Sequence, residues 1–229
     1  MTTIWLTDVS RSDIKIAGGK GASLGEMIRS GFPVPPGFII TASTYRDFIN
    51  EAGIAEQLVD IVGVDVEDSD ALVIAHSKAV NLIQNASISL SVQEDILLKF
   101  DELNQQIGEE DIFVAVRSSA TAEDLPEASF AGQQETYLNV RRSDLIERVK
   151  DCWASLFTQR AIYYRSEKGF STAEVDISVV IQSMIDAETS GVLFTRHPST
   201  GDPHMVIEAA WGLGEAVVSG EVSPDNYII

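Results

Sequence analysis

The chain has 229 residues, 45% of them hydrophobic and 22% charged, a composition typical of a folded globular protein rather than a disordered or fibrous one. Its 35 acidic residues outnumber its 16 basic residues, and the formal net charge of −19 argues against nucleic acid or an anionic membrane as a partner. The single Cys152 excludes an internal disulfide, and without an 18-residue apolar run or a secretory signal the sequence predicts a cytoplasmic location.

Helices are expected where apolar residues recur at spacings of three and four, and strands where short runs are rich in β-branched residues. In chain order these predicted elements are a helix after a glycine-rich turn within 16–30, a strand over 38–40, a helix that Thr41 or Ser43 can cap, helices over 70–86 and 91–108, strands over 112–116 and 137–140, one or two helices within 143–166, and strands over 175–185, 191–195 and 205–210.

Two of these elements carry specific predictions about where they end. Ser91 and Glu94 fit a capping box at the start of a helix, and Gly108 is placed to stop that helix. The run 112–116 is almost wholly apolar, so we expect a strand that is buried on both faces and ends at Arg117.

The change from helical to strand-rich patterns divides the chain. We place the boundary near residue 186 and predict an α+β fold with a helix-rich first lobe, residues 1–186, and the beginning of a sheet-rich second lobe, residues 187–229.

Lys20 stands in a glycine-rich segment, residues 18–21, directly before a predicted helix. Backbone N–H groups and the positive end of a helix attract anions, and a flexible ammonium group adds charge. The segment has neither the Walker A pattern nor the G-x-G-x-x-G pattern. It predicts a phosphate contact, while a plain turn with a solvated lysine explains the same residues.

Arg117 follows a predicted buried strand, where a guanidinium group is costly unless it meets an anion such as phosphate. Gly132 lets the backbone approach a ligand closely. Hydroxyl groups that can donate to phosphate belong to Ser118, Ser119, Thr121, Ser129 and Thr136. We interpret the segment as a flap over a polyphosphate; the alternative is a surface loop in which Arg117 pairs with Glu123 or Asp124.

Gln182 breaks a β-branched run and is followed by Met184, a pattern that can hold a flat purine while the amide reads its edge. Core packing explains the same residues. Glu215 follows a second glycine-rich turn, where its carboxylate can reach a ribose hydroxyl or a metal, or simply face solvent.

Several long motifs resemble the nucleotide-binding region of the phosphoenolpyruvate synthase family. The related families are the pyruvate phosphate dikinases and the rifampicin phosphotransferases, which share this ATP-grasp-like region. The resemblance runs in order along essentially the whole chain and rests on residues 18–27, 115–124, 128–139, 152–157 and 210–220.

The resemblance implies an ATP-grasp-like fold and an adenine nucleotide as ligand, with ATP and Mg²⁺ as cofactors. It implies that Lys20 and Arg117 contact ATP phosphates, that Gly132 and Thr136 belong to the phosphate flap, and that Gln182 lies beside the adenine. The reaction implied is conversion of ATP, pyruvate and water to AMP, phosphoenolpyruvate and phosphate through a phosphorylated histidine.

The same resemblance implies that this chain is a fragment. In the family, the phosphorylated histidine and the pyruvate site lie on further domains, and the acidic Mg²⁺ ligands follow the part that ends at residue 229. We therefore expect no catalytic residue and no metal ligand within this chain, and no catalysis by the chain alone, because the charge on the transferring phosphoryl group lacks a metal to stabilise it.

Two alternatives stay open on the sequence. The chain fits the ATP-binding domain of a rifampicin-type phosphotransferase equally well, because that site has the same motifs. A nucleotide-free domain whose acidic surface recruits a basic partner is a third reading, motivated by the net charge of −19.

Overall fold

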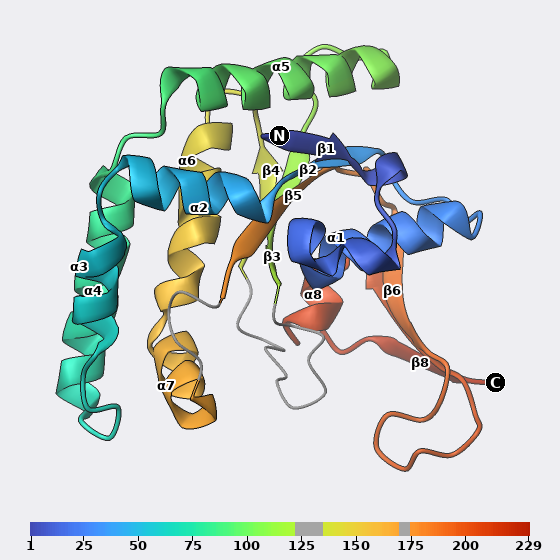
Figure 1. Cartoon of the computed structure of the whole chain (residues 1–229). Helices are drawn as coiled ribbons and strands as arrows, with labels where there is room; N and C mark the ends of the chain where they lie inside the picture. Colours follow the sequence, from blue (N-terminus) through green and yellow to red (C-terminus); the bar gives the residue numbers. More distant parts are fainter. Residues whose placement is uncertain (122–134, 170–174) are drawn as a thin grey trace. The chain divides into compact units, whose positions relative to one another are not determined.

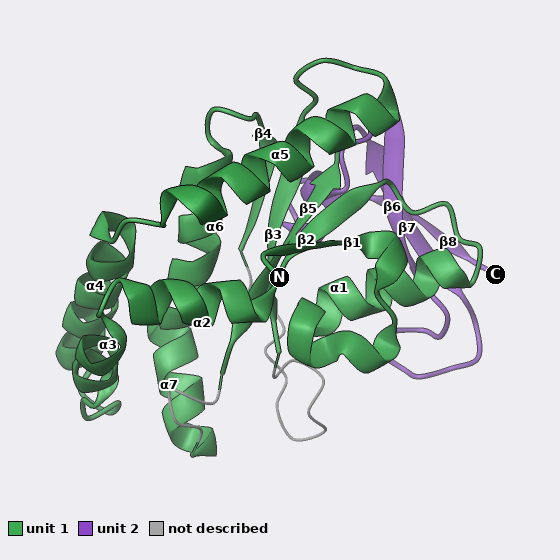
Figure 2. Cartoon of the chain, turned by 45° about the horizontal axis from the view of Figure 1, so that its top comes forward, with its two compact units in different colours: residues 1–184 green, residues 185–229 purple. Residues whose placement is uncertain are grey.

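The computed structural model describes residues 1–121, 135–169 and 175–229 and contains two units, residues 1–184 and residues 185–229 (Figure 2). Helices and two antiparallel sheets give the predicted α+β class, with an ATP-grasp-like composition of elements. The division between the units falls close to the boundary expected near residue 186; that the units are the two lobes of an ATP-grasp fold stays a prediction.

The first unit contains most of the predicted elements. In chain order they are β1 (Thr3–Trp5), α1 (Ile14–Arg29), β2 (Gly37–Ile40), α2 (Ala42–Glu51), α3 (Ala55–Val62), α4 (Ser69–Asn85), α5 (Leu90–Ile107), β3 (Val114–Ala120), β4 (Thr136–Val140), α6 (Leu145–Ala154), α7 (Gln159–Lys168) and β5 (Ile177–Ser183). Of these, β1 and α3 are short and were not predicted from the sequence.

The five strands of the first unit form one antiparallel sheet in the order β1-β2-β5-β3-β4. Alternate residues of a strand point to opposite faces, so β5 contributes to two cores. Val179 and Ile181 join the large core beneath α2, α5 and α6, whereas Val180 packs with Ile39 and with Leu24 of α1. Figure 1 shows α1 on one side of these strands and α2 and α6 on the other.

Two predicted ends are wrong. Ser91 does not cap α5, because the helix begins at Leu90 and Ser89 occupies the N-cap position. β3 does not end at Arg117 but continues to Ala120, paired with β5 throughout. Ser118 and Ser119 can continue the buried strand because their hydroxyl groups form hydrogen bonds with backbone atoms of neighbouring segments. The prediction that Gly108 ends α5 is confirmed, since Gly108 has a φ of 82°.

α1 is broken at Gly18, whose φ of 65° and ψ of 175° lie in a region that only glycine occupies readily. A Cβ atom at this position would lie 2.2 Å from the carbonyl oxygen of Ser119 in β3. The absence of a side chain therefore lets the start of α1 approach the sheet directly.

The second unit is a three-stranded antiparallel sheet with one short helix. Its elements are β6 (Thr189–Phe194), β7 (Val206–Trp211), α8 (Glu215–Val218) and β8 (Asp225–Ile228), with the strands in the order β6-β7-β8. In the parts of the chain that the structure describes, no helix is long and apolar enough to cross a membrane.

We predict that Gly18→Ala destabilises the protein much more than Gly53→Ala. Both glycines have a positive φ, of 65° and 66°, but a Cβ at Gly53 meets no atom within 4 Å. The strain of the left-handed region alone costs about 1–2 kcal/mol, and the backbone overlap at Gly18 should raise the loss to about 3 kcal/mol or more. Urea unfolding of both variants measures the difference; equal losses would contradict the proposed close contact.

Candidate functional site

Two buried serine hydroxyl groups fasten the break in α1 to the sheet. The Ser119 hydroxyl donates to the Ala17 carbonyl (3.0 Å) and accepts from the N–H groups of Lys20 (3.1 Å) and Gly21 (3.4 Å). The Ser178 hydroxyl, on β5, donates to the same Ala17 carbonyl at 2.6 Å. Ser119, on β3, thus caps the second part of α1, because its hydroxyl accepts from N–H groups that have no acceptor within the helix.

This arrangement changes the interpretation of the glycine-rich segment. The N–H groups of Lys20 and Gly21 donate to Ser119, so the cationic character of the segment comes from the Lys20 side chain. Burial raises the pKa of the Cys152 thiol on α6, and the positive charge of Lys20 counters part of that rise.

Arg117 and Gln182 meet on the sheet face that α1 covers. Arg117 lies two residues before Ser119 on β3, so both side chains point to this face. Its Nη1 atom donates to the Gln182 Oε1 atom at 3.3 Å, and the Gln182 Nε2 atom donates to the Pro35 carbonyl at 3.2 Å. The structure therefore brings Arg117, Gln182 and the backbone of Lys20 to one face of β3 and β5.

The Ser118 hydroxyl is committed to the backbone. It is buried, accepts from the Glu135 N–H group at 2.9 Å and donates to the Glu135 carbonyl at 3.2 Å, which fixes the start of β4 beside β3. A phosphate contact from Ser118 would have to break these bonds. Thr136, by contrast, is exposed and lies directly opposite Arg117 in the β3–β4 pair.

The remaining predicted residues are spread over the chain. The Met184 sulfur accepts from the Asn139 N–H group at 2.9 Å, so the thioether lies against β4. Gly132 falls outside the described residues, as do Ser129 and the alternative partners Glu123 and Asp124. Glu215 is exposed at the start of α8, in the second unit.

The described residues contain no group of three or more His, Cys, Asp or Glu side chains that could hold a metal ion. Sequence reasoning missed the positioning roles of Ser119 and Ser178. A signal existed for Ser178, since it is a polar residue that interrupts the apolar run at the start of β5.

Residues 14–229 match the family model described as pyruvate phosphate dikinase, AMP/ATP-binding domain, and the chain belongs to this family. It is 49% identical over 222 residues to a probable phosphoenolpyruvate synthase of Methanothermobacter thermautotrophicus and 51% identical over 228 residues to one of Methanocaldococcus jannaschii. It is 43% identical over 260 aligned residues to the phosphoenolpyruvate synthase of Pyrococcus furiosus.

These alignments cover 96%, 98% and 98% of this chain, respectively, but only 32%, 19% and 32% of the relatives. The chain thus spans at most about a third of the proteins it matches, and it corresponds to the part that the family model describes as nucleotide-binding.

We predict that Ser119→Ala costs about 2–4 kcal/mol of unfolding free energy, because it leaves two buried N–H groups without an acceptor. Ser155→Ala is the matched control. Ser155 is also buried, but among the described residues its hydroxyl makes a single bond, to the Cys152 carbonyl, and the loss should be about 1 kcal/mol. Chemical denaturation gives both values, and a smaller loss for Ser119→Ala than for the control would refute the capping role.

Proposed function

We propose that this chain binds ATP on the face of β3 and β5 that α1 covers. The observation that carries the proposal is the meeting of Arg117 and Gln182 beside the Ser119-anchored backbone of Lys20, in a chain of an AMP/ATP-binding domain family. Lys20 and Arg117 contact the phosphates, Gln182 and Met184 lie at the adenine, and Gly132 and Thr136 belong to the phosphate flap. Ser118 supports the flap through Glu135, and a ribose contact from Glu215, in the second unit, stays a prediction.

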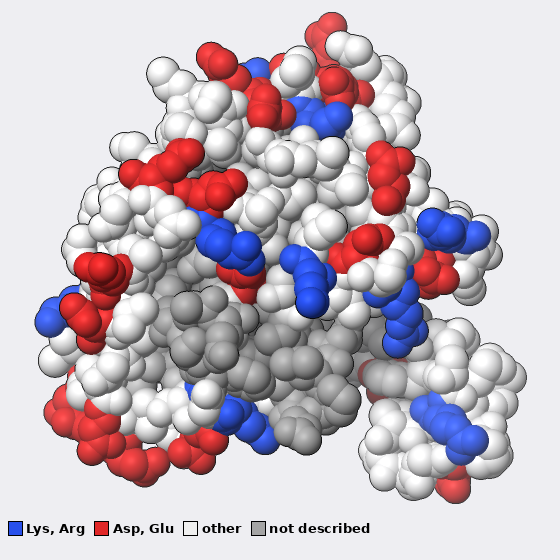
Figure 3. All heavy atoms as spheres, viewed as in Figure 1, with Lys and Arg blue, Asp and Glu red and all other residues white. Residues whose placement is uncertain are grey.

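Charge favours this location for a polyanion. The chain carries a formal net charge of −19, so an anionic ligand needs a local group of cations. In Figure 3, acidic side chains form groups along the edge of the visible face, whereas Lys and Arg side chains mostly stand singly. Arg117 supplies a planar donor set suited to phosphate oxygens, and Lys20 adds a second, more mobile charge.

We further propose that this site serves a longer enzyme that converts ATP, pyruvate and water to AMP, phosphoenolpyruvate and phosphate through a phosphorylated histidine. The names of the relatives favour this reaction over rifampicin phosphorylation, and family membership favours nucleotide binding over an acidic interaction domain. Mg²⁺ accompanies the nucleotide in this proposal, and its protein ligands lie outside the described residues. The histidine and pyruvate sites belong to other parts of the longer enzyme, and a cytoplasmic location fits the single cysteine.

Calorimetric titration with ATP and Mg²⁺ tests the proposal. Lys20→Ala and Arg117→Ala should each weaken binding about 10- to 100-fold, since a hydrogen bond to a charged group contributes about 1.5–3 kcal/mol. Arg160→Ala, which removes an exposed arginine from α7, is the control and should leave the affinity unchanged. Thermal unfolding without nucleotide checks that all three variants fold. An ATP affinity that is unchanged in both Lys20→Ala and Arg117→Ala would refute the assignment.

A second measurement separates adenine from phosphate recognition. If Gln182 reads the purine edge, Gln182→Ala should reduce the preference for ATP over GTP by on the order of tenfold, because one buried amide contact is worth roughly 1 kcal/mol or slightly more. Lys20→Ala should weaken both nucleotides and leave their ratio unchanged. If Lys20→Ala changes the ratio of ATP to GTP affinity and Gln182→Ala does not, the proposed roles of the two residues in phosphate and adenine recognition are wrong.

A further inference from the structure

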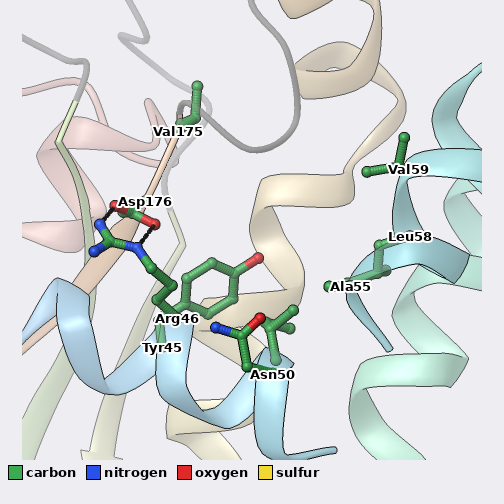
Figure 4. A pocket seen from close by; sticks show the side chains of 9 residues that line it. Tyr45, Arg46, Asn50, Ala55, Leu58, Val59, Val175 and Asp176 are labelled. Carbon is green, nitrogen blue, oxygen red and sulfur yellow. Dashed lines mark hydrogen bonds and ion pairs between the residues drawn. The ribbon is translucent and has the colours of Figure 1, made fainter. Parts of the chain in front are cut away.

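A cavity of about 220 Å³ lies in the first unit between α2, α3 and the residues that lead into β5 (Figure 4). Its apolar lining includes Ile49, Leu58 and Val175. Arg46 and Asn50 also line it and are exposed, so the cavity opens to solvent. None of its described lining residues belongs to the proposed nucleotide site. Because a cavity of roughly 150 Å³ holds benzene, this one is large enough for a small ring that carries one polar group.

Tyr45 supplies the polar group that faces this cavity. It lines the cavity from α2, and only 6% of the residue is exposed. In Figure 4 its hydroxyl points away from that helix, into the space between the labelled side chains. In the part of the chain that the structure describes, this hydroxyl has no hydrogen-bond partner. A buried hydroxyl without a partner is unfavourable, so a molecule in the cavity that bonds to it is stabilised there.

Water alone suits this cavity poorly. An ordered buried water molecule needs about two to four polar partners, and the apolar lining residues offer none. Arg46 and Asp176 are already joined to each other by two hydrogen bonds (Figure 4). A water molecule at the Tyr45 hydroxyl therefore has few further partners, whereas an organic molecule can bond to the hydroxyl and cover the apolar walls at the same time.

The described lining of the cavity carries no net charge. Arg46 and Asp176 form an ion pair, and the other described lining residues are uncharged. Burial raises the pKa of Tyr45, so its hydroxyl stays protonated at neutral pH. The guanidinium nitrogens of Arg165, on α7, are enclosed and do not line the cavity. A charged ligand would lose its hydration without meeting an opposite charge, and the cavity therefore favours a neutral molecule.

We propose that this cavity binds a small uncharged organic molecule with an apolar ring or branched body and one hydroxyl or carbonyl group. The polar group forms a hydrogen bond with the Tyr45 hydroxyl, and the apolar body contacts Ile49, Leu58 and Val175. A pure hydrocarbon of the same size fits less well, because it would exclude water from the Tyr45 hydroxyl without replacing the hydrogen bond. This proposal is independent of the nucleotide site.

Cyclohexanol is the probe, and the cyclohexylammonium ion is its charged counterpart of nearly the same shape. Cyclohexanol should shift the NMR signals of the Leu58 and Val175 methyl groups saturably, because both residues line the cavity. The methyl signals of Val73 and Leu90, which are exposed on α4 and α5, should not move. Cyclohexylammonium should bind at least about tenfold more weakly, because its charge has no partner in the cavity. Cyclopentanol should bind about fourfold more weakly, because it has one CH₂ group fewer to bury.

Variants locate the site. Tyr45→Phe keeps the ring and removes only the hydroxyl, so it should weaken cyclohexanol binding about five- to tenfold, the effect of one net hydrogen bond. Tyr163→Phe makes the same change at an exposed tyrosine on α7 and should leave the affinity unchanged. Ala55→Leu fills the cavity from α3 and should abolish binding while leaving Tyr45 in place, so the test holds even if Tyr45→Phe fails to fold. Ala71→Leu, at an alanine of similar burial on α4, is its control.

Saturating ATP with Mg²⁺ should leave the cyclohexanol response intact, because the cavity and the proposed nucleotide site share no described residue. Four outcomes would overturn the proposal. They are displacement of cyclohexanol by ATP, equally tight binding of cyclohexylammonium, a cyclohexanol affinity that Tyr45→Phe or Ala55→Leu leaves unchanged, and no saturable shift at all. The last outcome would indicate that water fills the cavity.

Discussion

The Ser119 hydroxyl is the contact on which the proposed site depends. The break of α1 at Gly18 leaves a carbonyl and two N–H groups without helical partners, and this hydroxyl accepts from both N–H groups and shares the carbonyl with the Ser178 hydroxyl. Because Ser119 lies on β3 two residues from Arg117, the same contact sets where Lys20 stands relative to Arg117. The glycine-rich segment and the arginine, a hundred residues apart in sequence, are thereby held by one strand.

Preorganisation extends from this contact to Gln182. The Arg117 guanidinium is held by the Gln182 carbonyl oxygen, while the Gln182 amide nitrogen is held by the Pro35 carbonyl. Gln182 is 7% exposed and both ends of its amide have partners, so its orientation is fixed by hydrogen bonds on either side. A ligand that meets these groups does not have to order them, which reduces the entropic cost of binding.

Most of the first unit could be predicted because its helices and strands follow apolar periodicity. Arg117 was selected because a guanidinium group at the end of a buried strand is costly without an anion, and Lys20 because it stands in a glycine-rich segment before a helix; their roles stay predictions. The roles of the hydroxyl groups could not be predicted. Ser118 and Ser119 are neighbours of the same type, yet they point to opposite faces, one holding β4 and the other α1. Only the tertiary partners of a strand decide whether a serine meets a ligand or the backbone, and those partners come from distant segments.

The burial of Arg165 likewise does not follow from its residue type, although the helical spacing around it indicated a buried position. It lies four residues after Ala161 and three after Ile162, both buried, so helical spacing places it on the inner face of α7. Arg117 is partly exposed and donates a hydrogen bond to the Gln182 amide. A partly exposed guanidinium group suits a hydrated polyanion. Burial, rather than residue type, thus separates two arginines of one unit: Arg117 is open to a ligand, whereas the guanidinium nitrogens of Arg165 are enclosed beside the Phe157 ring.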